Sequence, residues 1–200
     1  MKRHAPAALR NREPILSVLA PLLGERASIL EVASGRGEHC VFFASKMPGW
    51  RVQPSDPEAT ARASIEAYRA EAKLENLLPP LALDMAAAWA HEGVDAVLCI
   101  NMIHISPWEA TLGLLRGAAR TVRPGGVLVT YGPYRFEGEF RASSNRDFDA
   151  SLRSRDPRWG VRDEADITRE AKQFGFDREA VIPLPANNHA LVYRAPAKQA

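Results

Sequence analysis

A short stretch near the start of the chain, ILEVASGRGEH at residues 29–39, combines residue types that could hold a small-molecule ligand. An apolar run ends at Glu31, and Gly35 and Gly37 follow it in what reads as the turn between a strand and a helix. Glycine lets the backbone approach a ligand with no Cβ in the way. Taken alone, such a turn is as often a tight connection as a binding site, so its meaning depends on the groups around it.

Polar side chains also follow the next strand-like runs. Asp56 lies nineteen residues after Gly37, where a nucleotide-binding fold places an acid that accepts hydrogen bonds from ribose hydroxyls. Asp84 suits the exocyclic amino group of an adenine, and residues 101–104 follow the next run. Because ligands of an open parallel sheet bind at the carboxyl ends of its strands, we expect these groups to face one site. The alternative is that Asp56 and Asp84 only cap the helices that follow them.

The order of acid and glycines distinguishes between possible cofactors. A nicotinamide dinucleotide would need a third small residue, and Cys40 stands in that place. Its pyrophosphate would also be repelled by Glu31, whereas an acid there suits the sulfonium and ammonium groups of S-adenosylmethionine. We therefore expect S-adenosylmethionine as the cofactor. Its predicted contacts are Glu31, Ala33, Ser34, Gly35, Gly37, Asp56, Asp84 and Asn101.

Two residues are predicted to act on the methyl acceptor. Displacement of a methyl group from a sulfonium chiefly needs an acceptor held in line with it, and it needs a base only if the acceptor must lose a proton. His104 follows the run 95–101 and is predicted to contact the acceptor or to act as that base; alternatively, it packs under the next helix. Tyr134 follows the run 126–132 and is predicted to line the acceptor pocket with Tyr131, for which a half-buried place in the core is equally plausible.

The elements that would position these groups alternate along the chain. Strand-like runs lie at 28–33, 50–56, 80–84, 95–101 and 126–132, and helical patterns at 6–24, 39–46, 58–77, 106–122 and 163–174. Such alternation predicts an α/β protein with a parallel, doubly wound sheet. Ser106-Pro107-Trp108-Glu109 has the pattern of a capping box at a helix start. The runs 178–184 and 189–195 are too close for a crossover, so they predict an antiparallel hairpin.

The segment 133–163 is unusual because it connects two elements over 31 residues. It holds seven arginines, six acids, five aromatic residues and no lysine. A connection that long is typical of a functional lid or of a disordered insert, and five aromatic residues argue against disorder. We expect a lid over the acceptor side of the site. The arginines either bind an acidic acceptor or pair with the interleaved acids, and we favour pairing.

Length and composition define the class of protein. Two hundred residues, 46% hydrophobic and 25% charged, indicate one globular domain over residues 1–200. The net charge of +2 gives no reason to expect a nucleic acid or an anionic membrane as a partner. Cys40 and Cys99 are isolated, which suggests neither a disulfide framework nor a zinc site, and no metal is expected. The N-terminal residues lack the apolar core of a signal peptide, so we expect a cytoplasmic protein; the sequence does not indicate its oligomeric state.

The glycine turn resembles the first motif of the class I S-adenosylmethionine-dependent methyltransferases, E/D-x-G-x-G-x-G. This sequence reads EVASGRG at 31–37, with Ala33 in place of the first glycine, a departure that tightens the loop. RPGGVLVTYG at 123–132 resembles the segment before the family's fifth strand. The resemblance implies a three-layer, Rossmann-like fold with a seven-stranded, mostly parallel sheet that ends in an antiparallel hairpin.

Longer strings resemble a narrower group, the methyltransferase-like 26 family, which is classed as a domain of unknown function (DUF938). They cover nearly the whole chain: PAALRNREPIL, QPSDPE, NMIHISPWEA, YGPYRFEGEF, SNRDFDASLRSRDPRWGVRD and PANNHALVYR. The resemblance implies a methyltransferase-like fold and does not identify a substrate. The sequence thus predicts an S-adenosylmethionine-dependent methyltransferase with a small-molecule acceptor. The alternative is a non-catalytic protein that senses S-adenosylmethionine or its demethylated product, S-adenosylhomocysteine, or that scaffolds a partner.

Overall fold

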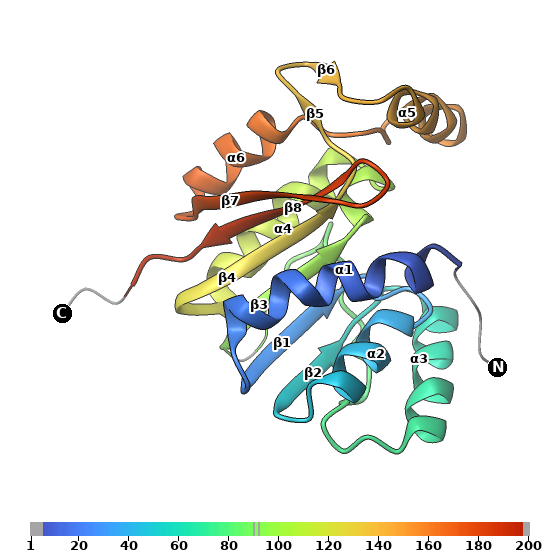
Figure 1. The fold of residues 1–200 in the computed structure, drawn as a ribbon, viewed down its shortest axis with the longest axis vertical. Helices are drawn as coiled ribbons and strands as arrows, with labels where there is room; N and C mark the ends of the chain where they lie inside the picture. Colours follow the sequence, from blue (N-terminus) through green and yellow to red (C-terminus); the bar gives the residue numbers. More distant parts are fainter. Residues whose placement is uncertain (1–5, 90, 92, 198–200) are drawn as a thin grey trace.

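The core of the fold is a six-stranded, mostly parallel sheet with helices on both faces (Figure 1). The computed structural model describes residues 6–89, 91 and 93–197. The strand order is β2-β1-β3-β4-β8-β7, and β8 is antiparallel to both of its neighbours. The strands are β1 (Ala27–Val32), β2 (Trp50–Pro54), β3 (Val94–Ile100), β4 (Val122–Gly132), β7 (Asp177–Leu184) and β8 (Asn188–Arg194).

The central strands are apolar along their length because both faces of the sheet are covered. In β3, VDAVLCI, five of the seven residues are buried, and every residue of β1 except Ser28 is buried. Continuous burial of this kind is typical of parallel sheets that lie between two layers of helices. The fold is therefore the three-layer, Rossmann-like arrangement that the alternating pattern predicts.

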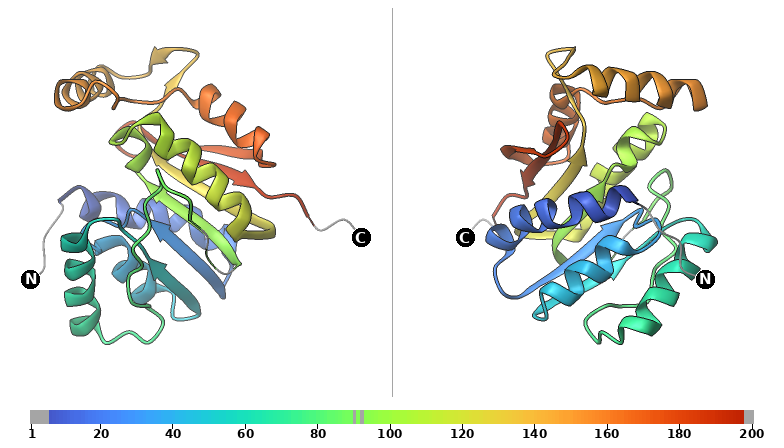
Figure 2. Two further views of the ribbon diagram at one scale, coloured as in Figure 1. Left: turned by 180° about the vertical axis from the view of Figure 1, so that it is seen from behind. Right: turned by 45° about the vertical axis from the view of Figure 1, so that its right-hand side comes forward.

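Two hydrophobic cores lie on opposite faces of this sheet. Helices α1 (Pro6–Leu23), α2 (Glu38–Lys46) and α3 (Ala59–Ala72) contribute Ile15, Phe43 and Ile65 to one core. Helices α4 (Trp108–Thr121) and α6 (Glu164–Gln173) contribute Leu114 and Ile167 to the other. Seen from behind in Figure 2, α4 lies across the face of the sheet opposite α1 and α2. Each helix therefore buries an apolar face against the strands.

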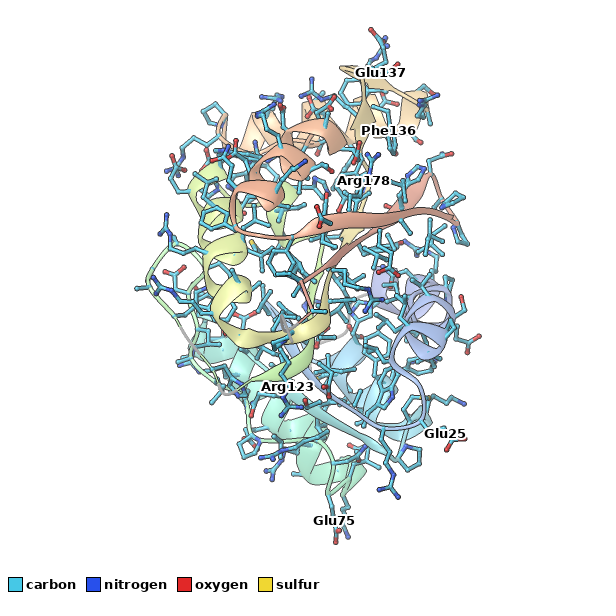
Figure 3. The ribbon with its side chains drawn as sticks, turned by 90° about the vertical axis from the view of Figure 1, so that its left-hand side faces the viewer. Glu25, Glu75, Arg123, Phe136, Glu137 and Arg178 are labelled. Carbon is cyan, nitrogen blue, oxygen red and sulfur yellow. The ribbon has the colours of Figure 1, made fainter. Side chains whose placement is uncertain are left out.

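The segment between β4 and α6 is folded. It forms the short strands β5 (Arg135–Phe136) and β6 (Glu139–Phe140) and then helix α5 (Ser143–Arg155). This part of the chain extends beyond the β7–β8 hairpin (Figure 1), and the turn at Glu137 lies at the end of the molecule opposite Glu75 (Figure 3). Two ion pairs lie within it, Arg153 with Asp149 at 2.8 Å and Arg158 with Asp156 at 2.7 Å. The prediction that these arginines pair with neighbouring acids is confirmed for both pairs.

The prediction of a strand at 80–84 is wrong. Leu81 makes a single bridge to Ser55, and residues 82–84 join no strand, so the main sheet has six strands rather than seven. Leu77 makes a second isolated bridge, to Val52, and Pro79 and Pro80 between Leu77 and Leu81 carry no backbone N–H, so the two bridges do not join into a ladder.

The predicted capping box at Ser106 is also wrong. The N-cap residue of α4 is Pro107, and the Ser106 hydroxyl donates to the carbonyl oxygen of Met102 at 2.7 Å. Met102 lies in a short 3-10 helix, η1 (Met102–His104), which directly follows β3. Serine readily bonds to nearby backbone carbonyls, and here that local bond forms in place of the cap.

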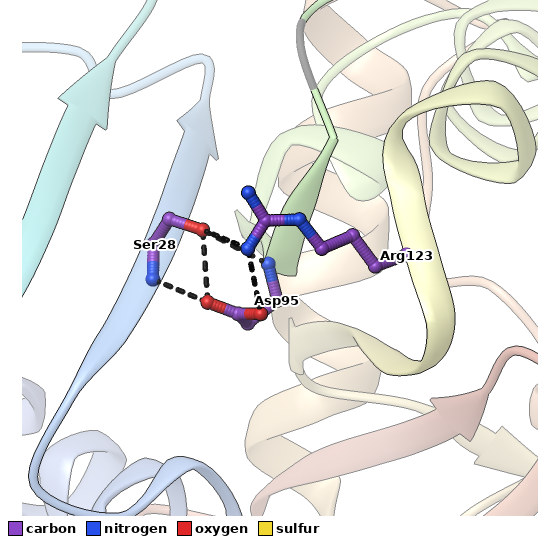
Figure 4. Close-up of polar contacts among 3 residues, drawn as sticks. All are labelled: Ser28, Asp95 and Arg123. Atoms are coloured by element: carbon purple, nitrogen blue, oxygen red, sulfur yellow. Dashed lines mark hydrogen bonds and ion pairs between the residues drawn. The ribbon is translucent and has the colours of Figure 1, made fainter.

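A polar cluster ties three strands together near their amino ends (Figure 4). Asp95 of β3 accepts hydrogen bonds from the backbone N–H of Ser28 at 2.7 Å and from its hydroxyl at 2.9 Å. Arg123 of β4 pairs with the other carboxylate oxygen of Asp95 at 3.0 Å. Burial raises the pKa of Asp95, but the bonds from Ser28 and Arg123 outweigh it, so the net pKa is lowered. This cluster fixes β1, β3 and β4 at the edge opposite their carboxyl ends.

Candidate cofactor and acceptor site

The glycine turn after β1 alternates three residues in left-handed backbone conformations. Ala33, Gly35 and Gly37 have φ values of 49°, 58° and 96°. A Cβ added at Gly37 would lie 3.0 Å from the side chain of Ile65, whereas a Cβ at Gly35 would meet nothing within 4 Å. Gly37 therefore allows α3 to pack against the turn, and Gly35 leaves its own side of the turn open to a ligand.

Glu31 is a buried acid with an unpartnered oxygen. It is 1% exposed, and within the described part of the chain its Oε2 atom has no hydrogen-bond partner. Burial raises the pKa of Glu31 to about 8 and the charge of Asp56 adds to this rise, while the nearby hydroxyl of Ser34 opposes it. The group is therefore largely uncharged at neutral pH. A cation bound beside it would supply the missing partner, as the sulfonium or ammonium of S-adenosylmethionine would.

Ser34 fixes the turn to the loop after β2. Its backbone N–H donates to the carbonyl of Ser55 at 2.8 Å, and the N–H of Ser55 donates to the Ser34 hydroxyl oxygen at 3.2 Å. The Ser34 hydroxyl itself donates to the carbonyl of Glu31 at 3.1 Å. Ser34 is 7% exposed, so its first task is to hold the two loops together.

Asp56 joins the same two loops through its carboxylate. One oxygen accepts the N–H of Gly35 at 2.9 Å, and the other accepts the N–H of Glu58 at 2.9 Å. Burial is the main reason that its pKa is raised, against the lowering effect of these bonds. The acid therefore lies at the glycine turn, as expected, and Glu58 rather than Asp56 is the N-cap residue of α3, so the alternative of a helix cap is wrong. A carboxylate has about four acceptor sites, so these two bonds leave capacity for ribose hydroxyls.

The remaining predicted cofactor contacts lie in different surroundings. Asp84 is exposed, and its carboxylate accepts the N–H of Ala86 at 2.8 Å in a turn of its own. Asn101 directly follows β3 in a left-handed conformation with φ 62°. These contacts bring together Glu31, Ser34 and Asp56 at the glycine turn. Asp84 is not part of this group of contacts.

His104 is fully buried and couples η1 to the end of the segment 133–163. Its Nδ1 accepts the N–H of Arg162 at 3.2 Å, and its carbonyl accepts the N–H of Gly160 at 2.9 Å. Burial, with the charge of Arg162 second, lowers the pKa of His104 to about 3. Because Nδ1 accepts a bond, the ring carries its proton on Nε2. A Cβ on Gly132 would lie 2.4 Å from that nitrogen, so the backbone of β4 shields it.

Tyr134 lies beside His104 in the same core. The two rings pack edge to face with their centres 5.0 Å apart. Tyr134 is fully buried, and its hydroxyl donates to the Thr130 hydroxyl at 2.8 Å. Burial raises the pKa of Tyr134 well above its usual value. Both residues predicted to act on the acceptor are therefore fully buried near the end of β4.

A cleft of about 740 Å³ lies at the carboxyl ends of β3 and β4. Its walls come from α1, the loop after β3, the end of β4, helix α5 and the β7–β8 turn, which lies between α5 and the first half of α1 in Figure 1. The lining residues are Arg10, Asn11, Pro14, Asn101, Ile105, Tyr131, Pro133, Ser144, Asn145, Phe148, Pro185, Ala186, Asn187 and Asn188. This volume is in the range of small-molecule sites. A groove of about 550 Å³ beyond the hairpin does not have the ends of β3 and β4 in its lining, and no residue of the glycine turn lines either the groove or the cleft.

Sequence reasoning missed the contribution of α1 to this cleft. The carboxamide oxygen of Asn11 lies 2.7 Å from Nε2 of His39 in α2, so that nitrogen is the donor. The side chain of Asn11 also lies beside Tyr131 at the end of β4, where it opposes the rise in the pKa of that hydroxyl that burial causes. Burial, and secondarily the charge of Arg12, lowers the pKa of His39 to about 4, so this ring is neutral. The signal available in the sequence was a polar pair, Arg10 and Asn11, ahead of the apolar positions of a helix.

Two further observations apply to the described residues alone. No group of three or more histidine, cysteine, aspartate or glutamate residues among them has the arrangement of a metal site. No helix formed by these residues combines the length and apolar character needed to cross a membrane.

Comparison with known proteins gives a family and a fold. The family described as "Protein of unknown function (DUF938)" matches residues 2–195. The solved structures similar to this chain include the S-adenosylmethionine-dependent methyltransferase SibL in its apo form, with 22% identity and a TM-score of 0.78 over 95% of this chain and 56% of SibL. Another is CalO1, a methyltransferase in calicheamicin biosynthesis, in its SAH-bound form, with 16% identity and a TM-score of 0.73 over 92% of this chain and 55% of CalO1.

A third similar structure is closer to this chain in length. It is a putative sarcosine dimethylglycine methyltransferase from Galdieria sulphuraria, with 16% identity and a TM-score of 0.75 over 95% of this chain and 87% of that protein. By contrast, the chain spans only about half of the first similar structures, 55% to 58% of three of them. At these identities the comparisons establish the class I methyltransferase fold.

Proposed function

Because the chain belongs to the DUF938 family, whose description assigns no activity, we propose its function from its own site: an S-adenosylmethionine-dependent methyltransferase that acts on a small molecule. One observation carries the proposal. A buried acid with an unpartnered oxygen, Glu31, stands beside a glycine turn whose Gly35 is open on one side. The finer resemblance to the methyltransferase-like 26 family is part of this proposal, as is a cytoplasmic location.

We propose the following roles for the residues of the site. Glu31 faces the sulfonium or ammonium group of the cofactor. The backbone of the turn from Ala33 to Gly37 packs against the cofactor, and the Asp56 carboxylate accepts hydrogen bonds from its ribose hydroxyls. When bound, the cofactor supplies an electrophilic methyl group. The cleft at the ends of β3 and β4 holds the acceptor, with Asn101 at its inner wall. Asp84 is proposed to accept the amino group of the adenine from its exposed turn.

His104 and Tyr134 are proposed to support this site from behind. His104 holds η1 and the residues around Arg162 in place, and the Tyr134 ring packs against it. With its proton on Nε2 and its Nδ1 engaged, His104 has no lone pair to take a proton from an acceptor. We therefore propose a positioning role for both residues.

Calorimetric titration tests the proposal. The protein should bind S-adenosylmethionine and S-adenosylhomocysteine and should not bind NADH. Asp56→Ala should raise the dissociation constant for both ligands by about ten- to a hundredfold, because a charge-assisted contact is lost. Glu75→Gln, an exposed change at the far end of the molecule, serves as the matched control (Figure 3).

The outcomes separate the candidate functions. Binding of NADH in place of both adenosyl ligands would contradict the proposal. Tight binding of both adenosyl ligands without methyl transfer to any acceptor of a broad small-molecule collection would favour a sensor instead.

A further inference from the structure

The charge of the cleft indicates the class of acceptor. Arg10 is the only charged side chain among the described residues that line the cleft, and these include no acid, lysine, histidine or cysteine. No ion pair between described residues involves Arg10. A free guanidinium is a strong donor for carboxylates and other oxyanions, and it repels ammonium groups. The cleft therefore favours an anionic ligand over an amine.

Tyr131 adds a neutral donor to the same cleft. Burial raises the pKa of Tyr131, so its hydroxyl keeps its proton. The carboxamide oxygen of Asn11 is engaged with His39, so the group that Asn11 can turn toward Tyr131 is its N–H₂ donor. The hydroxyl of Tyr131 donates no hydrogen bond to another described residue, so its proton is free to donate to a ligand in the cleft. Arg10 and Tyr131 then form a pair of donors without a neighbouring base.

The apolar walls indicate the rest of the acceptor. Ile105 and Phe148 belong to the few large hydrophobic residues that are exposed among those described, at 42% and 38%, and both line the cleft. Pro14, Pro133 and Pro185 extend this surface. Apolar area that stays exposed inside a cleft is typical of a site that buries an apolar ligand.

We propose that the acceptor is a small organic acid with an apolar body, and that its ionised oxygen receives the methyl group. This inference rests on the proposed function. Transfer to such an oxygen forms a carbon–oxygen bond and breaks a carbon–sulfur bond, whose electron pair stays on sulfur. The negative and positive charges are both lost, and no proton is released. The step therefore needs no base, which agrees with a cleft whose lining contains none.

Direct binding of matched probes tests the acceptor class without turnover. Benzoate, benzamide and benzylamine have the same apolar body and differ in charge. Titrated into protein saturated with S-adenosylhomocysteine, benzoate should bind about ten- to a hundredfold more tightly than benzamide, and benzylamine should bind most weakly. Equal or tighter binding of benzamide or benzylamine would overturn the proposal.

Substitution of Arg10 tests the residue. Arg10→Gln should weaken benzoate binding by about tenfold or more and leave benzamide and S-adenosylhomocysteine binding unchanged, and Arg10→Lys should restore part of the loss. Arg116→Gln, an exposed change on α4, is the matched control and should alter neither. Unchanged benzoate binding in Arg10→Gln would overturn the proposal. If the parent protein fails to bind S-adenosylhomocysteine, the proposed function itself is wrong; if it binds this ligand and prefers the amine, only the acceptor class is wrong.

Discussion

At the level of single residues, Glu31 links ligand binding to stability. In the unfolded chain this acid has its ordinary pKa of 4.5, and in the folded protein the pKa is about 8. The folded state therefore binds more protons between these values, and stability falls as the pH rises from about 4.5 to 8. A buried acid that costs stability at neutral pH is typical of a site that is shaped for its ligand.

Glu31→Gln should separate these two effects. The variant should be more stable than the parent at pH 8 by about 1–3 kcal/mol, measured by urea denaturation without ligand, because the buried group no longer has to ionise or hold a proton. Its affinity for S-adenosylmethionine should fall about tenfold or more. The parent's affinity should rise between pH 6 and 8.5 as Glu31 ionises, beyond any change shown by the variant. Glu25→Gln is the exposed control, and an identical pH dependence in all three proteins would contradict this role.

Ala33 is a second residue whose conformation has a measurable cost. It has a left-handed backbone with φ 49°, which costs a residue with a Cβ about 1–2 kcal/mol relative to glycine. Ala33→Gly removes that strain, although glycine is less ordered in the unfolded chain. The net gain in the free energy of unfolding should be about 0.5–1 kcal/mol by urea denaturation. Glycine introduced at Ala67, which lies in the interior of α3, should instead destabilise the protein.

At the level of elements, α5 is held to the β7–β8 turn by one asparagine from each. The side-chain amide of Asn145 donates to the carbonyl of Asn187 at 3.0 Å, and the amide of Asn187 donates to the Ser144 hydroxyl at 3.3 Å. These contacts close one wall of the cleft, since all three residues line it. The placement agrees with the expected cover over the acceptor side, and whether the cover moves stays a prediction.

Limited trypsin digestion measures that motion. Cleavage between Arg141 and Arg155 should be slower with S-adenosylhomocysteine and an acceptor bound than in the free protein. Asn145→Ala should speed cleavage of the free protein several-fold, because the first turn of α5 loses its anchor. Ser154→Ala, at the exposed far end of α5, is the control. Equal cleavage rates with and without ligands would mean that the segment is a fixed part of the fold.

Elements with strong periodic patterns could be predicted from the sequence, and elements set by long-range packing could not. The run 95–101 is apolar at every position from Ala96 to Ile100, and β3 occupies 94–100. Helix α5 has little pattern, since Leu152 is its only buried apolar residue. The glycine turn and Asp56 could be placed because each follows a strand of the parallel sheet, and the carboxyl ends of parallel strands lie at the same edge. The wall that α1 gives to the cleft could not, because it depends on the contact of Asn11 with Tyr131, 120 positions further along the chain.

At the level of the whole molecule, the cluster of Ser28, Asp95 and Arg123 aligns the sheet at the edge opposite the site. The folded-state pKa of Asp95 is lowered, so its contribution to stability is present above the unfolded value of 3.8 and is lost as the pH falls through the folded value. The Asp95 side chain is 40% exposed, so solvent screens this contribution strongly.

Asp95→Asn should lower the free energy of unfolding by about 0.5–1 kcal/mol at pH 7 and should have a smaller effect near pH 2. Urea denaturation at both values measures this difference, and Glu75→Gln is the control. Because the cluster lies far from the glycine turn, ligand affinity should not change. A loss of ligand affinity in Asp95→Asn would show that the alignment of the strands affects the glycine turn.

The position of α1 has a consequence for the order of binding events. Asn11 contacts His39 of the helix that follows the glycine turn and Tyr131 of the cleft, so one helix is a wall of both sites. A ligand that orders α1 from one side removes part of the ordering cost for a ligand on the other side, and such coupling is reciprocal by thermodynamic necessity. S-Adenosylhomocysteine should therefore tighten benzoate binding by the same factor as benzoate tightens S-adenosylhomocysteine binding. In Asn11→Ala that common factor should approach one, and the two ligands would then bind as if they occupied separate proteins.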